Sequence, residues 1–530
     1  MTTSTSVTSA REKRSSPGIA VRDPTEPRYL TGGTGFLVLV AIFLALLMGG
    51  MDALVVSTVL PDIAGDLHQV NGVTFVVAAY LISSTVAIPI FSRLSDTVSR
   101  RNTFLAGLAI FIVGSMLAGV SQNLSELILF RGVQGLGGGG TFPVAIAMVG
   151  VLYPPATRTR ATGFLSAAAG ISIVLGPLVG SYIVMVATWR WVFYINLPFG
   201  AAALLVTLLA IGPLRPSVPG RFDVPGAALV ASWVGALMFA LVQVSDSGWA
   251  WTDPRILALL LGAAVLLGVF LWWELRNPQP LVPLRLLGRR VIGAVSGIML
   301  FTGVVFSSVI TFLSVFVGIV LLHQGPTATS SVRDMIYFFA VPMIVAAALS
   351  GQILLRVPYR ALVAPALLIA GAVGFLLTRL TPTIPLWVLA FRFLPVGGIA
   401  LPLIPMGFGL GLSLAGSQIA ILNEAPEREV GAAVGLTRFF QSFGGAVGIS
   451  LLTVFESWRY QSLAANASTP SGVADALVTS YNEVFLVLAL SILVAAAFAL
   501  GLAGRASKPG RDEATRVTLE RQESASNGPP

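Results

Sequence analysis

The chain has 530 residues, of which 55% are hydrophobic and 10% are charged, and its mean hydropathy is +0.87. Soluble globular proteins carry about 25% charged residues, so this composition excludes a soluble globular chain and indicates a protein surrounded by lipid. The chain has no cysteine and two histidines. This excludes disulfides, thiolate chemistry and cysteine-based metal sites and argues against a histidine-rich one, so we expect no metal and no cofactor.

The first 35 residues are polar and rich in arginine, and the first long apolar run begins near Phe36. A cleaved signal peptide would place a short apolar core nearer the start of the chain. We therefore interpret residues 1–35 as a cytoplasmic tail. Residues 504–530 are similarly polar and are interpreted as a second cytoplasmic tail.

Fourteen apolar runs lie between the tails, and each is long enough for a membrane span, which requires about 20 mostly apolar residues. They fall at 36–60, 73–91, 104–120, 124–152, 161–186, 191–212, 225–244, 255–273, 291–320, 335–355, 361–380, 386–422, 431–455 and 484–503. The twelfth run is too long for one helix. We expect Pro395, Pro402 and Pro405 to break it, with its main helix after Ile399 and residues 378–398 partly at the outer surface.

Two linkers rich in proline and arginine, at 213–224 and 274–290, divide the spans into six, two and six. The sequence therefore predicts an all-α polytopic membrane protein with two six-helix bundles, at 36–212 and 291–503. Two inserted helices and their cytoplasmic linkers occupy 213–290. Two such bundles place a binding site between them, near the middle of the membrane.

The basic residues are distributed unevenly between the two sides of the predicted membrane. With the N-terminus inside, 24 of them fall in inside segments and five in outside loops. This is a strong positive-inside signal, and it places both termini in the cytoplasm. It also explains the net charge of +9 without a role in nucleic-acid binding, because the basic loops face anionic lipid. Thirty of the 32 basic residues are arginine, which fits GC-rich coding, so we expect a bacterial inner membrane.

Asp52 lies deep in the first span. A carboxylate at a helix centre costs about 2.5–3.5 kcal/mol on insertion scales, so it should face a cavity or a partner. Arg131 in the fourth span is the expected partner, because a guanidinium stays charged and must be paired or hydrated. We interpret Asp52 as a proton carrier. In this interpretation Arg131 and the proton compete for its carboxylate. A structural ion pair between packed helices is the alternative.

The loop after the second span contains Asp96, Arg100 and Arg101. Such a charged loop can simply set the orientation of the protein in the membrane. The more specific hypothesis is a cytoplasmic gate. In that hypothesis Asp96 engages the positive N-terminal end of a helix from the other half, and this contact breaks during the conformational switch.

Glycines and a proline mark two of the spans. Gly176, Pro177 and Gly180 lie in the fifth span, where proline bends a helix and small residues allow close packing. This segment suits a helix that flexes, or that packs closely between the halves. The run Gly135–Gly140 in the fourth span formally matches GxGxxG. A dinucleotide site requires a βαβ context, so we interpret this run as a packing surface.

Together these motifs resemble the fourteen-span drug:proton antiporter branch of the major facilitator superfamily, over nearly all of the chain between the tails. The most specific similarity is the string from Trp189 to Gly200, and the segment Gly431–Gly448 around Arg438 and Gln441 is also similar. The other residues that carry the resemblance are Asp52, Leu60, Pro61, Ile63, Ala64, Asp66, Leu67, Leu94, Asp96, Arg100, Arg101, Leu127, Arg131, Gln134, Gly135, Gly137, Gly176, Pro177 and Gly180. The departures from the family motifs are Ser92, Ser99, Ser172 and Ser181 in place of glycine, and Leu54 and Ser57 in place of Thr and Asn.

The resemblance implies multidrug efflux by alternating access, driven by inward proton flow, with Asp52 as the proton site and the proton as coupling ion. The expected substrates are small lipophilic drugs, with cationic drugs as one class, and the expected outcome is antibiotic resistance. Tyr80, Gln134 and Asp334 are candidate cavity residues, although Asp334 also fits an ordinary acid at a helix start. We expect a monomer in contact with membrane lipid.

Three alternatives remain open. The first is a dedicated exporter of an endogenous lipid, siderophore or self-made antibiotic, which a narrow competition profile would favour. The second is a channel, which predicts flux far above carrier rates and no uphill transport. The third is a membrane enzyme. We do not expect an enzyme, because His68 and His323 fall in predicted outer loops with no paired acids nearby in sequence.

Overall fold

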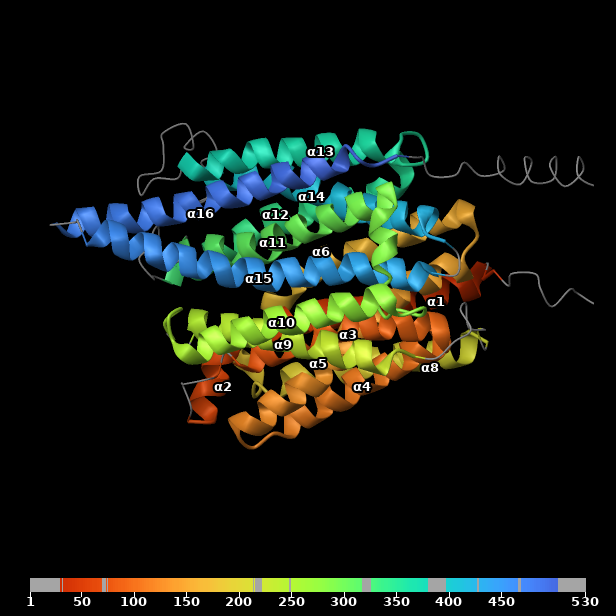
Figure 1. Ribbon diagram of the computed structural model, residues 1–530. Helices are drawn as coiled ribbons and strands as arrows, with labels where there is room; N and C mark the ends of the chain where they lie inside the picture. Colours follow the sequence, from red (N-terminus) through yellow and green to blue (C-terminus); the bar gives the residue numbers. More distant parts are fainter. Residues whose placement is uncertain are drawn as a thin grey trace, which may run out of the picture.

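The computed structural model describes residues 29–30, 32–68, 73, 75–212, 214, 222–246, 249–316, 326–379, 397–426, 429–465 and 469–503. These residues form a bundle of roughly parallel and antiparallel helices without a strand among them (Figure 1). Each long helix corresponds to one of the apolar runs of the sequence. The all-α architecture that the sequence predicts is therefore confirmed.

The first half contains six long segments. They are α1 (Gly32–Thr58), α3 (Phe75–Thr97), α4 (Arg100–Val120), α5 (Leu124–Leu152), α6 (Pro155–Val186) and α8 (Asn196–Ala210). Two short helices, α2 (Leu60–Asp66) and α7 (Trp191–Tyr194), connect them. Side-chain caps define two of the starts: Ser99 accepts from the Asn102 amide before α4, and Asn123 accepts from the Glu126 amide before α5.

The inserted pair and the second half follow. The pair consists of α9 (Val224–Asp246) and α10 (Pro254–Arg276). After a short 3₁₀ helix, η1 (Leu284–Gly288), come α11 (Arg290–Val315), α12 (Pro326–Ile353), α13 (Tyr359–Gly374), the 3₁₀ helix η3 (Phe375–Arg379), α14 (Gly397–Glu424), α15 (Val430–Ala464) and α16 (Pro470–Ala499). The last two helices extend well beyond the others at one end of the bundle (Figure 1).

Thirteen helices in the described part of the chain are long and apolar enough to cross a membrane, and Tyr337–Ile353 of α12 adds a shorter apolar stretch. This agrees with the expected fourteen spans. One detail of the expectation is wrong: Pro402 and Pro405 lie inside α14 and do not break it. Membrane helices tolerate proline where neighbouring groups satisfy the freed carbonyls. Pro395 lies outside the described residues.

The two halves meet along α3 with α15 and along α6 with α12. The inserted helix α9 contacts both α3 and α15, and α10 packs against α9. Aromatic pairs make these contacts: the Trp233 and Phe443 rings are 5.6 Å apart, and the Phe75 and Phe239 rings are 6.0 Å apart. The pair therefore lies beside the seam between the halves, as Figure 1 shows.

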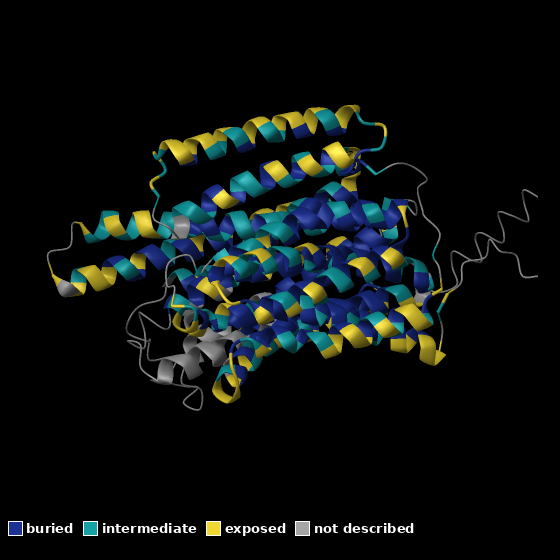
Figure 2. Ribbon diagram, turned by 90° about the horizontal axis from the view of Figure 1, so that it is seen from below, coloured by how far each residue is buried: buried dark blue, intermediate teal, exposed yellow. Residues whose placement is uncertain are grey.

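Buried residues lie mainly toward the inside of the bundle, and exposed residues line the outer faces of the helices (Figure 2). The outer faces are apolar: Leu261, Val265 and Leu275 of α10 are 68%, 58% and 74% exposed. In a bilayer, lipid tails solvate such side chains, so the exposed apolar surface fits a membrane-embedded protein.

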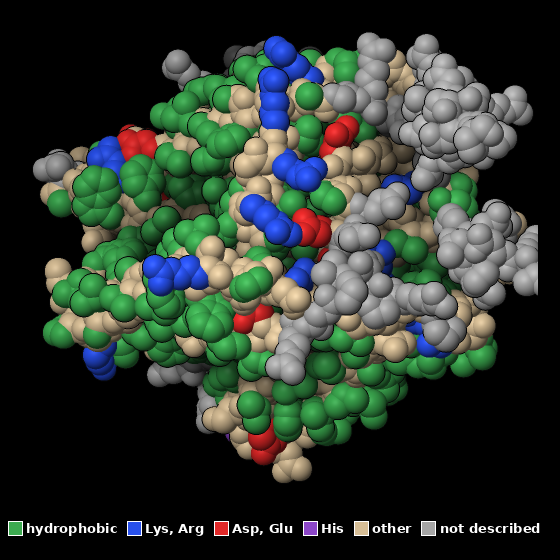
Figure 3. Space-filling model, turned by 45° about the vertical axis from the view of Figure 1, so that its right-hand side comes forward, with side chains coloured by type: hydrophobic (Ala, Val, Ile, Leu, Met, Phe, Trp, Pro, Cys, Tyr) green, Lys and Arg blue, Asp and Glu red, His purple; other side chains and the backbone are tan. Residues whose placement is uncertain are grey.

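One end of the bundle carries the arginine-rich turns, with Arg93, Arg100, Arg101, Arg158 and Arg290. We call it the basic end. Figure 3 turns this end toward the viewer, and blue Arg side chains gather over it. These arginines come from the segments that the sequence assigns to the inside of the membrane.

Candidate functional site

A buried ion pair connects α1 and α5 in the first half. Arg131 Nη1 donates to Asp52 Oδ2 at 2.5 Å, and the two side chains are fully buried. Arg131 Nε also donates to the Val76 carbonyl of α3 at 3.2 Å. The sequence predicts that Arg131 is the partner of Asp52, and in the structure the two side chains are in direct contact. Each neutralises a charge that the apolar surroundings would otherwise strongly disfavour.

Three polar residues complete a network around Asp52. Gln134 Nε2 donates to Asp52 Oδ1 at 2.8 Å, and Asn196 Nδ2 donates to the same oxygen at 2.9 Å. Both amides also contact Ser115 Oγ at 3.1 Å, and Ser115 donates to the Phe193 carbonyl at 2.8 Å. Arg131 Nη1 further donates to Gln134 Oε1 at 2.7 Å. The carboxylate therefore accepts three side-chain hydrogen bonds, and the one from Arg131 is charge-assisted.

Glycines allow the helices of this network to approach each other. A Cβ at Gly114 of α4 would lie 2.5 Å from the Gln134 backbone nitrogen of α5. A Cβ at Gly135 of α5 would lie 2.5 Å from the Tyr80 carbonyl of α3. Any larger side chain at either position would push these helices apart. The glycine run of α5 is thus a packing surface, as its place inside a span predicts.

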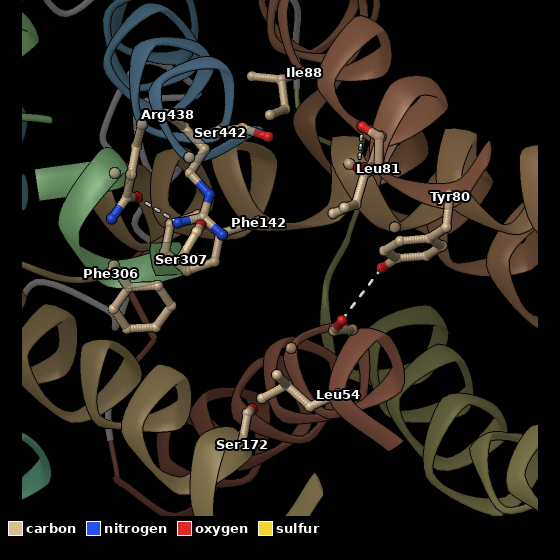
Figure 4. Close-up of a pocket in the computed structure, with 18 of the residues that line it drawn as sticks. Leu54, Tyr80, Leu81, Ile88, Phe142, Ser172, Phe306, Ser307, Arg438 and Ser442 are labelled. Carbon is tan, nitrogen blue, oxygen red and sulfur yellow. Dashed lines mark hydrogen bonds between the residues drawn. The ribbon is translucent and has the colours of Figure 1, made fainter. Parts of the chain in front are cut away.

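Tyr80 separates the ion pair from a cavity of about 400 Å³ between the two halves. The Arg131 guanidinium lies 4.3 Å from the centre of the Tyr80 ring. The Tyr80 hydroxyl lines the cavity and donates to the Gly49 carbonyl of α1 at 3.2 Å (Figure 4). Asp52 itself does not line the cavity. A movement of Tyr80 would therefore connect the carboxylate with the cavity.

The cavity is formed by both halves. The first half contributes residues of α1, α3, α4, α5 and α6, among them Leu54, Tyr80 and Phe142. The second half contributes residues of α11, α14 and α15, among them Phe306 and Arg438. Figure 4 shows these side chains around a common space. This is the position between two bundles where transporters of this architecture bind substrate.

Asp96 joins the two halves at the basic end. It is fully buried, and it accepts from the backbone N–H groups of Gly431 at 3.3 Å and Ala432 at 2.8 Å, in the first turn of α15. Arg100 donates to Asp96 at 3.1 Å. A carboxylate at a helix N-terminus is favoured by the unpaired N–H groups and the helix dipole. The contact is the one that the gate hypothesis describes.

Arg101 has a different set of partners from Asp96 and Arg100. Its guanidinium donates to the Leu208 carbonyl near the end of α8 at 3.0 Å, and to Asn102 at 3.5 Å. A cation there stabilises the negative C-terminal end of α8. In this conformation Arg101 therefore contacts α8 of its own half, and its place in the gate stays a prediction.

The glycines of α6 have two kinds of neighbour. A Cβ at Gly176 would lie 2.7 Å from the Leu54 Cβ, and one at Gly180 would collide with Thr58, so both pack against α1. Gly163, nearer the basic end, packs against Ala347 of α12 in the other half. The motif glycines thus hold α6 against the helix that carries Asp52. The Pro177 side chain lies outside the described part of α6.

The remaining sequence candidates are placed as follows. Tyr80 lines the cavity, as expected. Gln134 does not, because it turns toward Asp52 and is fully buried. The side chain of Asp334 in α12 lies outside the described residues. The sequence interpretation missed Asn196 and Ser115 as members of the network. Asn196 lies in the string from Trp189 to Gly200, where an amide in an apolar stretch was the available signal.

Comparisons with known proteins agree with this geometry. Residues 42–449 match the family model described as the Major Facilitator Superfamily. The chain is 29% identical to the multidrug transporter protein MdtP of Bacillus subtilis, over 82% of this chain and 77% of that protein. It is 30% identical to the tetracenomycin C resistance and export protein of Streptomyces glaucescens, over 79% and 76%. The fold resembles the human organic anion transporter MFSD10, with a TM-score of 0.58, 15% identity and coverage of 87% of this chain and 100% of that one.

The family match spans most of the chain, and it includes the helices that carry Asp52, Arg131, Asp96 and Arg438. Members of this family are transporters, which excludes the membrane enzyme considered from the sequence. The protein is a multi-pass membrane protein that belongs to the major facilitator superfamily, with multidrug and antibiotic resistance transporters among its relatives.

Proposed function

We propose that this protein is a proton-coupled antiporter that exports small lipophilic drugs across the bacterial cell membrane. The proposal rests mainly on one observation, the buried Asp52 held by Arg131 one side chain away from a cavity between the halves. In this proposal the protein acts as a monomer, both termini are cytoplasmic, and the basic end faces the cytoplasm.

The proposed cycle uses competition for Asp52. In the conformation described here, Arg131, Gln134 and Asn196 all donate to the carboxylate. Protonation of Asp52 removes the charge that holds Arg131, so the guanidinium and the Tyr80 ring beside it are released together. The halves then rock, and the proton leaves on the other side. Each charge that moves inward gains about 2.3 kcal/mol per 100 mV of membrane potential.

The gate contact supplies the second part of the cycle. Opening the basic end requires the α15 N-terminus to leave Asp96, because the bond to Ala432 bridges the two halves. The bond to Arg100 lies within the first half and can remain. A fully buried carboxylate would then become accessible to water, and water would compensate the lost backbone hydrogen bonds. The gate is therefore well suited to two states of similar free energy.

The test is transport by purified protein in proteoliposomes with an imposed proton gradient. Asp52→Asn keeps the shape of the side chain and removes its titratable charge. Asp62→Asn is the matched control, because Asp62 is an exposed acid in α2. We expect uphill, gradient-dependent movement of lipophilic dyes in the native protein and in Asp62→Asn, and its loss in Asp52→Asn. Equal uphill movement in all three would remove Asp52 from the coupling role.

A second candidate is a dedicated exporter of one endogenous product. The similarity to a protein named for export of tetracenomycin C supports it, beside the similarity to a multidrug transporter. Competition between unrelated compounds separates the two candidates. Inhibition of dye transport by many scaffolds favours multidrug export, and inhibition by a single scaffold favours the dedicated exporter.

A further inference from the structure

The cavity between the halves has an unusual charge. Among the described residues that line it, Arg438 of α15 carries the single formal charge, and none is an acid. The Asp52 carboxylate lies behind Tyr80 and is already neutralised by Arg131. A substrate in the cavity therefore meets a cation. This is the reverse of the electrostatics that would attract a lipophilic cation.

The Arg438 guanidinium has few partners within the protein. It donates one hydrogen bond, to Gln441 of the same helix, and it lies 4.2 Å from the centre of the Phe142 ring on α5. None of the ion pairs found among the described residues includes Arg438. A guanidinium has five N–H donors, so most of its hydrogen-bonding capacity is unused by the described groups. Figure 4 shows this side chain extending over Phe142 at the cavity wall.

Arg131 provides the comparison within the same molecule. That arginine is buried as well, but it binds a carboxylate, an amide oxygen and a backbone carbonyl. A buried or half-buried guanidinium without a counter-ion is unfavourable, because the charge is removed from water and gains little in return. A ligand that brings an anionic oxygen to Arg438 would supply the missing counter-ion.

The surroundings of Arg438 fit the head group and the body of such a ligand. Ser307 of α11 and Ser442 of α15 place hydroxyl groups in the same cavity wall. The Ser442 hydroxyl pairs with Thr85 Oγ1 at 2.7 Å, and it can donate to a ligand oxygen when Thr85 is the donor of that pair. Phe142, Phe306 and Leu54 provide an apolar wall for the rest of the molecule. A few polar groups on a mostly apolar wall are typical of small-molecule sites.

We propose that the cavity takes amphipathic substrates with an acidic oxygen group, such as a carboxylate or a phenolate, and that Arg438 binds this group. The inference rests on the proposed export function and specifies its substrate class. It replaces the cationic drugs that the sequence alone had suggested. The competing explanation is structural, in which Arg438 holds α15 against α5 through Phe142.

Binding of two xanthene dyes, fluorescein as the anion and rhodamine 123 as the cation, tests the proposal. Affinities are measured by fluorescence polarisation on purified protein in detergent, without a proton gradient, so the outcome does not depend on coupling through Asp52. We expect the native protein to bind fluorescein more tightly than rhodamine 123. Arg438→Gln should weaken fluorescein binding at least tenfold and leave rhodamine 123 binding unchanged or stronger, and Arg438→Lys should lie between.

Phe142→Leu tests the structural explanation, because it removes the ring contact with Arg438 and keeps the guanidinium. Since Phe142 also lines the cavity, this variant should change the affinities for both dyes by a similar factor and so preserve the preference for fluorescein. The proposal is overturned if the native protein shows no preference for fluorescein, including no binding of either dye. It is also overturned if Arg438→Gln weakens both dyes equally, which is the result expected from a structural role. Proton coupling can fail in the transport assay while this charge preference holds, so failures of the two proposals are distinguishable.

Discussion

The backbone N–H of Ala432 donates to the Asp96 carboxylate at 2.8 Å, across 336 positions of the sequence and between the two halves of the transporter. The carboxylate is fully buried, and Gly431 and Arg100 donate to its other oxygen. Because the bonds from Gly431 and Ala432 bridge the halves and the bond from Arg100 stays within the first half, the bridging contacts can break while Asp96 remains paired. Asp96 thus contributes two backbone hydrogen bonds to the closure of the basic end.

Asp96→Asn should shift the protein toward conformations in which the basic end is open. Hydrogen bonds to charged groups contribute about 1.5–3 kcal/mol, and about 1.4 kcal/mol corresponds to a tenfold population change. The chain has no cysteine, so spin labels can be placed uniquely at the exposed positions Val98 and Arg360, one in each half. We expect about tenfold more of the longer label distance in Asp96→Asn. Glu126→Gln, at the opposite end, should not change the distances, and identical distances in Asp96→Asn would refute the gate.

Gly435→Ala should prevent α15 from packing against α3, because its Cβ would collide with the Ser92 side chain. Overpacking of this kind costs about 1–3 kcal/mol. Ser92→Gly removes both colliding atoms, so the double variant should recover dye transport in proteoliposomes. Ser92→Ala keeps the Cβ and should fail to rescue. Equal transport by the native protein and by Gly435→Ala would show that the contact does not limit the cycle.

Asn196→Ala should destabilise the network around Asp52. The amide donates to Asp52 and to Ser115. The loss of a hydrogen bond to a buried charge should cost about 1.5–3 kcal/mol. The measurement is the midpoint of thermal unfolding in detergent, as a double-mutant cycle with Asp52→Asn. An additive effect of the two substitutions would contradict a direct role of Asn196 on the carboxylate.

Asp66 at the end of α2 should make stability depend on pH in the acid range. Arg190 and then Trp189, which donate to its carboxylate at 2.6 and 2.9 Å, hold the pKa of Asp66 below its ordinary value. The contribution is fully present above the unfolded pKa of about 3.9 and is lost as pH falls through the lower folded pKa. The carboxyl is half exposed, so we expect about 0.2–1 kcal/mol.

Thermal unfolding of the native protein and of Asp66→Asn, compared from about pH 6 down to about pH 2, measures this contribution. The native protein should be the more stable at the upper end, and the difference should vanish at the lower end. A difference that grows as the pH falls would contradict the sign of the pKa shift.

The sequence by itself determined the elements and the charged residues of the site. Spans are recognisable because only long apolar runs are stable in lipid, and Asp52 and Arg131 stand out because a charge there is costly. Asn196 and Ser115 did not stand out, since neutral polar side chains are compatible with many positions in a membrane helix. The continuity of α14 through Pro402 also depended on its neighbours rather than on local propensity.

Only the tertiary structure decided which residues share a space. Gln134 belongs to the Asp52 network and not to the cavity, Arg101 caps α8, and Gly176 packs on α1. The sequence marks Arg438 as a charge within an apolar run. Whether Arg438 has a counter-ion depends on helices that are distant in sequence. Arg438 lines a cavity that both halves form, and no acid is among the described residues of its lining. This arrangement follows from the tertiary structure alone. A charge can be located from hydropathy, whereas its counter-ion is a property of three-dimensional packing.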